Sequence, residues 1–156
     1  MCPVFSDIAH GEHAVSNDLD QATETVNRMI EVVQNAQRIE AVDELFASDF
    51  VNHSAPPGYP SDREGMRRLF SATHRGFPDG KIEVLDQISN GSRVWTHKAF
   101  TGTHTGNFAG AEATGRMVTY EVIDILKVAD GRIVAHWSAI DRLSLFQQLG
   151  LLGQGT

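Results

Sequence analysis

The sequence predicts an α+β fold, in which three N-terminal helices pack on one side of a curved antiparallel meander of four strands. The apolar residues follow a helical period from Asp20 to Phe77, and beyond Phe77 the period changes to two. Two dipeptides, Asn90-Gly91 and Asp130-Gly131, then stand between extended apolar stretches, and each is typical of a two-residue hairpin turn. Helices that precede a run of strands favour the α+β class, and 156 residues suit one domain with one core.

Each of the three expected helices has an apolar stripe at helical spacing. The first begins after Asp20, and the second covers residues 39–46. The proline-rich stretch SAPPGYPS cannot continue a regular element, because proline fixes φ and lacks a backbone donor. Ser61 and Glu64 form a capping box, which predicts that the third helix begins there. The residues expected to face inward are Ala22, Val26, Met29, Ile30, Val33, Ile39, Val42, Leu45, Phe46, Met66, Leu69 and Phe70.

The predicted strands flank the two turns. KIEVLDQIS and SRVWTHKAF enclose the first turn, and MVTYEVIDILKVA and RIVAHWSAI enclose the second. A Gly- and Thr-rich connection, TGTHTGNFAGAEATG, joins the two hairpins, and DRLSLFQQLG predicts a short closing helix. Before the proline-rich stretch, FVNH predicts a short extended segment.

The two turns also predict which side chains share a face of the sheet, because a two-residue loop fixes the pairing register. The first turn pairs Asp86 with Trp95. On the other face it pairs Glu83 with Lys98, an opposite-charge pair typical of a wetter surface. The residues expected on the more apolar face of the two hairpins are Asp86, Trp95, His97, Tyr120, Asp124, Trp137 and Asp141.

In the second hairpin the turn pairs Tyr120 with Asp141 and Asp124 with Trp137. By the same count His136 points to the opposite face of the sheet. A β-bulge in either hairpin would reverse the two faces beyond it. We therefore expect Trp137 and Asp141 to line one pocket together with Asp124 and Tyr120, and His136 to point to the other side of the sheet. Four residues of strand separate the two carboxylates, roughly 13 Å, which leaves room for a substrate between them.

The two faces of the predicted sheet suggest different roles. Burying a carboxylate without a partner costs several kcal/mol, so three carboxylates on the apolar face predict a polar-lined cavity instead of a solid core. The opposite face is too apolar for full exposure and predicts a homodimer interface. Its residues are Val94, Thr96, Phe100, Ile123 and Ile125.

Composition and charge narrow the class of partner. A net charge of −7 argues against nucleic-acid binding, which needs a basic surface, and no apolar run approaches the ~20 residues that span a bilayer. The first twenty residues lack the basic start and apolar stretch of a secretory signal, and Cys2 is the only cysteine. We expect a cytoplasmic protein whose partner is a small hydrophobic molecule, with no nucleic acid and no membrane.

Three stretches match the motifs of a known protein family in their order and spacing. They are FVNHSAPPG, GTHTGNFAGAEATGRMV and IDILKVADGRIVAHWSAIDRLSLFQQLG. From about residue 20 to 150 the chain resembles the SnoaL-like polyketide cyclases of the nuclear transport factor 2-like superfamily. The resemblance implies a cone-shaped barrel of curved sheet wrapped by three helices, a deep internal pocket and dimers formed through the sheet. We expect a single SnoaL-like domain over 19–152, with a flexible N-terminal tail over 1–18, where the residues show no periodicity, and a C-terminal tail over 153–156.

The same resemblance implies cofactor-independent intramolecular aldol chemistry on a hydrophobic, carbonyl-bearing substrate. In that family Asp141 would be the general acid/base and Asn52 would line the substrate site. Where the characterised cyclases have a histidine on the strand before the turn, this chain has Asp124. Other members of the superfamily hydrolyse epoxides, isomerise ketosteroids or only bind ligands. An epoxide hydrolase, an isomerase or a non-catalytic ligand-binding dimer is therefore the alternative.

The residues themselves leave two roles open for Asp141. A carboxylate in an apolar pocket has a raised pKa and becomes a competent base, whereas Asp directly before RLSLFQQLG also suits a helix N-cap. The histidines and carboxylates show no pair at metal-ligand spacing on one element, so we expect no metal. The candidate substrate-binding residues, each with a purely structural alternative, are Asn52, His53, Trp95, His97, Tyr120, Asp124 and Trp137.

Overall fold

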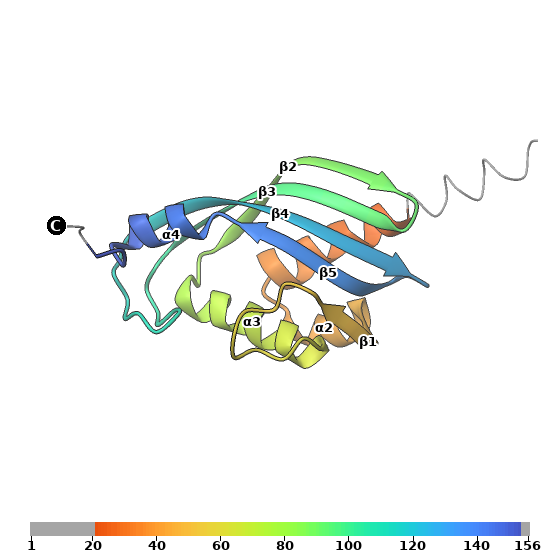
Figure 1. Ribbon diagram of the computed structural model, residues 1–156, viewed down its shortest axis with the longest axis horizontal. Coiled ribbons are helices and arrows are strands. Elements are labelled where there is room, and N and C mark those ends of the chain that lie inside the picture. The colour runs from red at the N-terminus through yellow and green to blue at the C-terminus, as the bar shows by residue number, and fades with distance from the viewer. Residues whose placement is uncertain (1–20, 154–156) are drawn as a thin grey trace, which may run out of the picture.

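The computed structural model describes residues 21–153, and it consists of an open, curved sheet with helices against one face (Figure 1). The predicted tail over 1–18 lies outside the described residues, as do residues 154–156. The sheet has five strands in the order β1-β5-β4-β3-β2. The strands are β1 (Phe46–Asn52), β2 (Lys81–Asn90), β3 (Arg93–Thr103), β4 (Met117–Ala129) and β5 (Arg132–Ile140).

Strands β2 to β5 form the predicted antiparallel meander, and β1 adds a strand parallel to β5. The α+β class and the curved sheet are confirmed. The sheet does not close into a barrel, because β1 and β2 are its two edges and do not pair with each other. The segment FVNH, expected to be extended, forms the end of β1 and the first residue beyond it.

The helices lie where the apolar stripes predict them. Residues 21–29 are helical and continue as a π-helical turn, η1 (Ile30–Asn35), and a 3-10 turn, η2 (Ile39–Ala41), leads into α2 (Val42–Leu45). Together with α3 (Arg63–Gly76) these segments lie on one side of the sheet, while α4 (Arg142–Leu149) lies at its end (Figure 1). None of the helices in the described part of the chain is long and apolar enough to cross a membrane.

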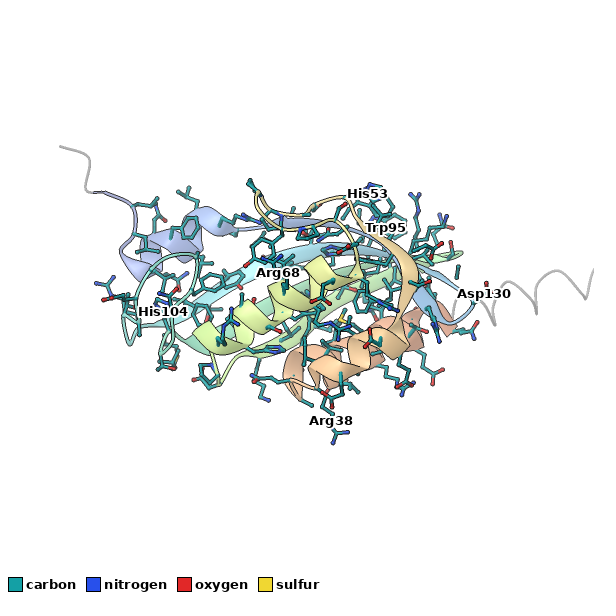
Figure 2. All side chains as sticks on the ribbon, turned by 90° about the horizontal axis from the view of Figure 1, so that it is seen from below. Arg38, His53, Arg68, Trp95, His104 and Asp130 are labelled. Atoms are coloured by element: carbon teal, nitrogen blue, oxygen red, sulfur yellow. The ribbon has the colours of Figure 1, made fainter. Side chains whose placement is uncertain are left out.

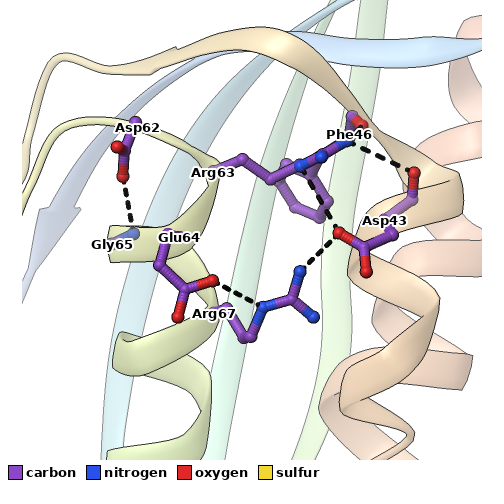
Figure 3. Close-up of polar contacts among 7 residues, drawn as sticks. All are labelled: Asp43, Phe46, Asp62, Arg63, Glu64, Gly65 and Arg67. Atoms are coloured by element: carbon purple, nitrogen blue, oxygen red, sulfur yellow. Dashed lines mark hydrogen bonds and ion pairs between the residues drawn. The ribbon is translucent and has the colours of Figure 1, made fainter.

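Helix α3 begins one residue later than the capping box predicts. Its N-cap is Asp62, whose Oδ1 accepts the backbone N–H of Gly65 at 2.8 Å, and not Ser61 (Figure 3). Asp43 of α2 pairs with both Arg63 and Arg67, which fixes α2 against the start of α3 (Figure 3). Because these ion pairs are partly exposed, each contributes only ~0–1 kcal/mol, and they orient α3 more than they stabilise it.

In the first hairpin the turn and the inner face both differ from the prediction. Asn90 pairs with Arg93, so the turn is Gly91-Ser92, with Gly91 at φ 63° in the first central position, where a type II′ turn requires glycine. The inner face of β3 consists of Val94, Thr96, Lys98 and Phe100, all buried. Trp95 and His97 therefore lie on the outer face, and Asp86 is exposed.

The error in the first hairpin has a physical cause. Lys98 looked like the surface partner of Glu83, but it lies opposite Val84 and is only 2% exposed, because a carboxylate on the next strand neutralises it. The predicted dimer face was wrong for the same reason. Val94, Thr96 and Phe100 belong to the core, and only Ile123 and Ile125 lie on the outer face.

In the second hairpin the predicted turn is confirmed, but the register changes after it. Ala129 pairs with Arg132 around Asp130-Gly131, whose φ angles of 51° and 72° match a type I′ turn. After Val128↔Ile133 the pairing shifts to Lys127↔Ala135, so Val134 is an extra residue in β5. This bulge exchanges the two faces of β5 beyond it.

The bulge therefore overturns the predicted neighbours in the second hairpin. His136 lies opposite Leu126 on the inner face, and Trp137 lies opposite Ile125 on the outer face. Asp124 pairs with Ser138 and not with Trp137, and Tyr120 of β4 pairs with no residue of β5. Asp141 is not part of the sheet but follows β5 directly.

Candidate active site

The bulge in β5 brings His136 beside Asp124 on the buried face of the sheet. His136 Nε2 lies 3.1 Å from Asp124 Oδ1, and His136 Nδ1 lies 2.9 Å from Asn52 Oδ1. The other carboxylate oxygen of Asp124 forms an ion pair with Lys98. All four residues are at most 7% exposed. Asn52, Lys98, Asp124 and His136 are called the buried network below.

Each member of the buried network comes from a different strand: Asn52 from β1, His136 from β5, Asp124 from β4 and Lys98 from β3. Asn52 pairs with His136 across the β1–β5 ladder, and its Oδ1 also accepts the backbone N–H of Ser54 at 3.0 Å. The proline-rich turn after β1 thus fixes the orientation of the Asn52 amide. Lys98 Nζ also donates to Gln34 Oε1 at 3.2 Å, which ties the network to η1.

The charges around Asp124 decide its protonation. Burial opposes the ionised carboxylate, but the Lys98 ammonium and the hydrogen bond and charge of His136 outweigh it, so the pKa of Asp124 lies well below its usual value. Asp124 is therefore an ionised carboxylate whose two oxygens are both engaged. Its role in the site is to hold Lys98 and His136, not to accept a proton at neutral pH.

The buried network lines one side of a cavity of about 280 Å³, near the lower end of the range for small-molecule sites. The rest of the lining is mostly apolar and comes from α3, the sheet, the β3–β4 connection and α4. Its larger apolar members are Met66, Leu69, Phe70, Phe77, Ile82, Phe100, Phe108, Val122, Ile140, Leu145 and Phe146. The cavity therefore suits a hydrophobic molecule with a small polar part.

Tyr120 also lines the cavity and is 8% exposed. Burial raises the pKa of its phenol, against a smaller opposite effect of Arg142, and the charge of Asp124 adds slightly to the rise. The phenol is therefore neutral and can donate its O–H. Within residues 21–153 this hydroxyl has no hydrogen-bond partner, so it is available to a molecule in the cavity.

The structure brings three of the predicted site residues to the cavity and leaves the others outside it. Asn52, Tyr120 and Asp124 line it. His53 stacks on Trp137 with ring centroids 4.6 Å apart, and His97 pairs with Glu121 at 2.8 Å on the outer face. Trp95, the last of the predicted site residues, also lies on the outer face. In Figure 2, His53 and Trp95 lie toward the turn at Asp130 and away from His104.

Asp141 is the N-cap of α4, the second of the two roles that the sequence left open. Its side chain accepts the backbone N–H of Ser144 at 3.0 Å, and its own backbone N–H donates to Glu121 O. The residue is exposed and does not line the cavity. The carboxylate that does line the cavity is Asp124.

Two residues of the buried network, His136 and Lys98, were not among the predicted site residues. One available signal was the spacing of Lys98, which alternates with Val94, Thr96 and Phe100 and so shares their face. The extra residue in β5 has no comparable local signal, because RIVAHWSAI reads equally well as an unbroken strand.

The model of the SnoaL-like polyketide cyclase family matches residues 24–149. The aklanonic acid methyl ester cyclase of Streptomyces peucetius is 30% identical over 128 residues, which cover 80% of this chain and 88% of that protein. The nogalonic acid methyl ester cyclase of Streptomyces nogalater is 24% identical over 124 residues, covering 74% and 88%. The crystal structure of IdmH from Streptomyces antibioticus is 35% identical with a TM-score of 0.73, covering 83% of this chain and 99% of IdmH.

Proposed function

This chain belongs to the SnoaL-like polyketide cyclases, and from that premise we propose that it closes a ring by intramolecular aldol addition in a hydrophobic, carbonyl-bearing polyketide, without a cofactor. The relatives named above are methyl ester cyclases and support a cyclase role. An aldol closure breaks a C–H bond next to one carbonyl, joins that carbon to a second carbonyl carbon and adds a proton to the second oxygen. Substrate and product are isomers, so acid/base groups suffice.

The observation that carries this proposal is the His136–Asp124 pair, which lies in an otherwise apolar cavity. A histidine within reach of the substrate can move a proton to or from a reacting atom, and groups of this kind contribute about 10²–10⁴-fold to the rate. Asp124 fixes the histidine ring from one side and Asn52 from the other. The apolar walls hold the carbon skeleton and keep water from the reacting atoms.

We propose the His136–Asp124 pair, and not Asp141, as the acid/base group. The proposal follows from position, since Asp141 is exposed and already accepts a hydrogen bond as the N-cap of α4. A base must reach the proton that it removes, at a heavy-atom distance of about 2.6–3.2 Å or through one water. His136 and Tyr120 line the cavity, whereas Asp141 does not.

Ring closure of the methyl esters that the relatives use tests the proposal. Purified protein is incubated with aklanonic acid methyl ester or nogalonic acid methyl ester. The expected result is a product of unchanged mass and altered chromatographic retention. His136→Gln should lower kcat by about 10²-fold or more. The matched control is His97→Gln, which removes the histidine of a His–carboxylate pair on the outer face and should keep full activity.

Two outcomes would count against the proposal. Wild-type turnover in His136→Gln would remove the pair from the mechanism. Binding of both esters without ring closure would favour the ligand-binding alternative.

The outer face of the sheet supports a second proposal, that the protein is a homodimer. Trp95, Ile123, Ile125 and Trp137 lie on this face, and Ile88 beside Trp95 is 64% exposed. Contiguous apolar side chains on one face of a sheet are typical of a protein–protein interface.

A further inference from the structure

The charged groups that line the cavity are mostly cationic. Within the described residues the lining includes one carboxylate, Asp124, and two permanent cations, Lys98 and Arg142. The whole chain carries a net charge of −7, so an excess of positive charge in its cavity runs against the rest of the molecule. In a largely apolar cavity such an excess attracts an anionic ligand far more than it would in water.

His136 is held inside the buried network. The backbone N–H of Ser54 donates to Asn52 Oδ1, which identifies this atom as the amide oxygen, so His136 Nδ1 donates its own hydrogen to it. His136 Nε2 contacts an oxygen of the Asp124 carboxylate. Both ring nitrogens are therefore engaged, and Lys98 and Arg142 are the permanent cations that a ligand in the cavity would meet.

The lone carboxylate does not remove this excess, because Asp124 is already shared between Lys98 and His136. The Lys98 ammonium has three hydrogens, of which Asp124 and Gln34 accept two. The third has no acceptor among residues 21–153. On the inner face of the sheet Lys98 lies opposite Val122, diagonal to both Asp124 and Tyr120. Lys98 and Tyr120 are thus diagonal neighbours on the inner face, and both line the cavity.

We infer that the cavity binds its substrate as an oxyanion conjugated to a second carbonyl, as in an ionised 1,3-dicarbonyl. The charged oxygen is received by Lys98 and Tyr120, and the carbon skeleton lies along the apolar walls. The inference rests on the proposed cyclase function and names its substrate class. It also adds the charge of the bound substrate, which the proposed function leaves open.

The bonds, charges and protons of this ring closure balance. The carbon of the bound enolate attacks the second carbonyl carbon, and the new C–C bond leaves a negative charge on the second oxygen. That oxygen then takes up one proton from solvent. An anionic substrate plus one proton thus gives a neutral product, with no oxidant or reductant.

The test compares two probes by calorimetry on the wild-type protein at neutral pH. The first is 5-phenylcyclohexane-1,3-dione, which is an enolate at this pH, and the second is 3-phenylcyclohexanone, which has the same skeleton and stays neutral. We expect the enolate to bind at least about tenfold more tightly, as a charge-assisted hydrogen bond allows. Equal affinities, a preference for the neutral ketone, or no binding of either probe would overturn the inference.

Tyr120→Phe locates the preference in the cavity, since it removes one donor and keeps the ring. It should weaken the binding of the enolate about threefold or more and leave the affinity for the neutral ketone unchanged. If the ratio of the affinities for the enolate and the neutral ketone is unchanged in this variant, the anion binds elsewhere and the inference is also overturned. Lys98→Met is the less informative variant, because it leaves Asp124 buried without its main counter-charge.

Failure of this inference and failure of the proposed function give different results. If the two probes bind equally but His136→Gln still abolishes ring closure, the enolate site is wrong and the cyclase stands. If the enolate is preferred but the wild-type protein closes no ring, the anion site stands and the cyclase proposal fails.

Discussion

His136 Nε2 lies 3.1 Å from Asp124 Oδ1 on the helix-covered face of the sheet, although their turn alone would put the two side chains on opposite faces. The single extra residue in β5, Val134, makes the difference. Without it Trp137 would occupy the inner face, and the carboxylate would meet an indole in place of an imidazole. Which residues form the buried network thus depends on one β-bulge, and β-bulges are common next to active sites.

The stability of the protein should depend on Asp124 much more than on Glu121. Asp124→Asn leaves the Lys98 ammonium buried without its counter-charge, and removing one partner of a buried ion pair costs about 3–5 kcal/mol. Glu121 holds an exposed pair with His97, so Glu121→Gln should change the free energy of unfolding by less than about 0.5 kcal/mol. Urea denaturation of the two variants measures the difference. Similar losses in both would contradict the assignment of Asp124 to a buried pair.

The stability of the protein should also fall steeply in acid. The pKa of Asp124 in the folded protein is lower than in the unfolded chain, where it is about 3.9, so folding favours the ionised carboxylate. Its contribution is complete above the unfolded pKa and is lost as the pH falls through that value toward the folded pKa. Urea midpoints of the wild-type protein should therefore decline between about pH 5 and pH 2.

The double variant Asp124→Leu, Lys98→Met serves as the control for this pH dependence. It removes the ion pair and leaves no single charge behind, and such replacements are often neutral or stabilising at neutral pH. Its urea midpoint should fall less steeply in acid than that of the wild-type protein. If the midpoints of the two proteins fall in parallel, other groups, and not Asp124, govern the acid transition.

Asp141 can be tested separately as a helix cap and as a base. Asp141→Ala removes the hydrogen bond to the backbone of Ser144 and should destabilise the protein by about 0.5–2 kcal/mol, with turnover retained. Asp141→Ser keeps a good N-cap but no carboxylate, so it should restore most of that stability and remain active. If Asp141→Ser is as stable as the wild-type protein but inactive, Asp141 is the base after all.

The parts of the structure that the sequence predicted are those set by local chemistry. Asp130-Gly131 forms its turn because both residues accept a positive φ, and the apolar stripes of the helices follow from their period. The face of Lys98 could not be predicted in this way, since its burial depends on Asp124, which lies on another strand. Asn52 and Asp124 line the cavity, but their common partner, His136, depends on a bulge with no local signal.

The oligomeric state should depend on the outer face of the sheet. Light scattering is expected to give about twice 17.1 kDa for the wild-type protein. Ile123→Glu places a charge among Trp95, Ile125 and Trp137 and should shift the mass to that of the monomer. Leu143→Glu is the matched control, an exposed apolar residue on α4 that should leave the mass unchanged. A wild-type monomer, or dissociation in both variants, would argue against this interface.

The connection between β3 and β4 should set the affinity for substrate, because Phe108 and Ala109 form part of the cavity wall. This connection lies directly against the end of α3: the backbone N–H groups of Thr105 and Gly106 both donate to Gly76 O at 3.1 Å. A Cβ on Gly106 would come within 1.9 Å of the backbone oxygen of Arg75, which cannot move without unwinding the helix end. Gly106→Ala must therefore displace the connection, and Phe108 with it.

We expect Gly106→Ala to raise KM by about tenfold or more while kcat changes less, since Asp124 lies in the interior of β4, well beyond Met117 where the connection ends, and His136 lies on β5. The control is Gly110→Ala in the same connection. A Cβ there meets no atom within 4 Å, although φ of 79° makes alanine strained, so it should cost some stability but leave KM nearly unchanged. Steady-state kinetics with the methyl ester substrate distinguish the two variants. Equal KM values would show that the position of Phe108 does not limit substrate binding.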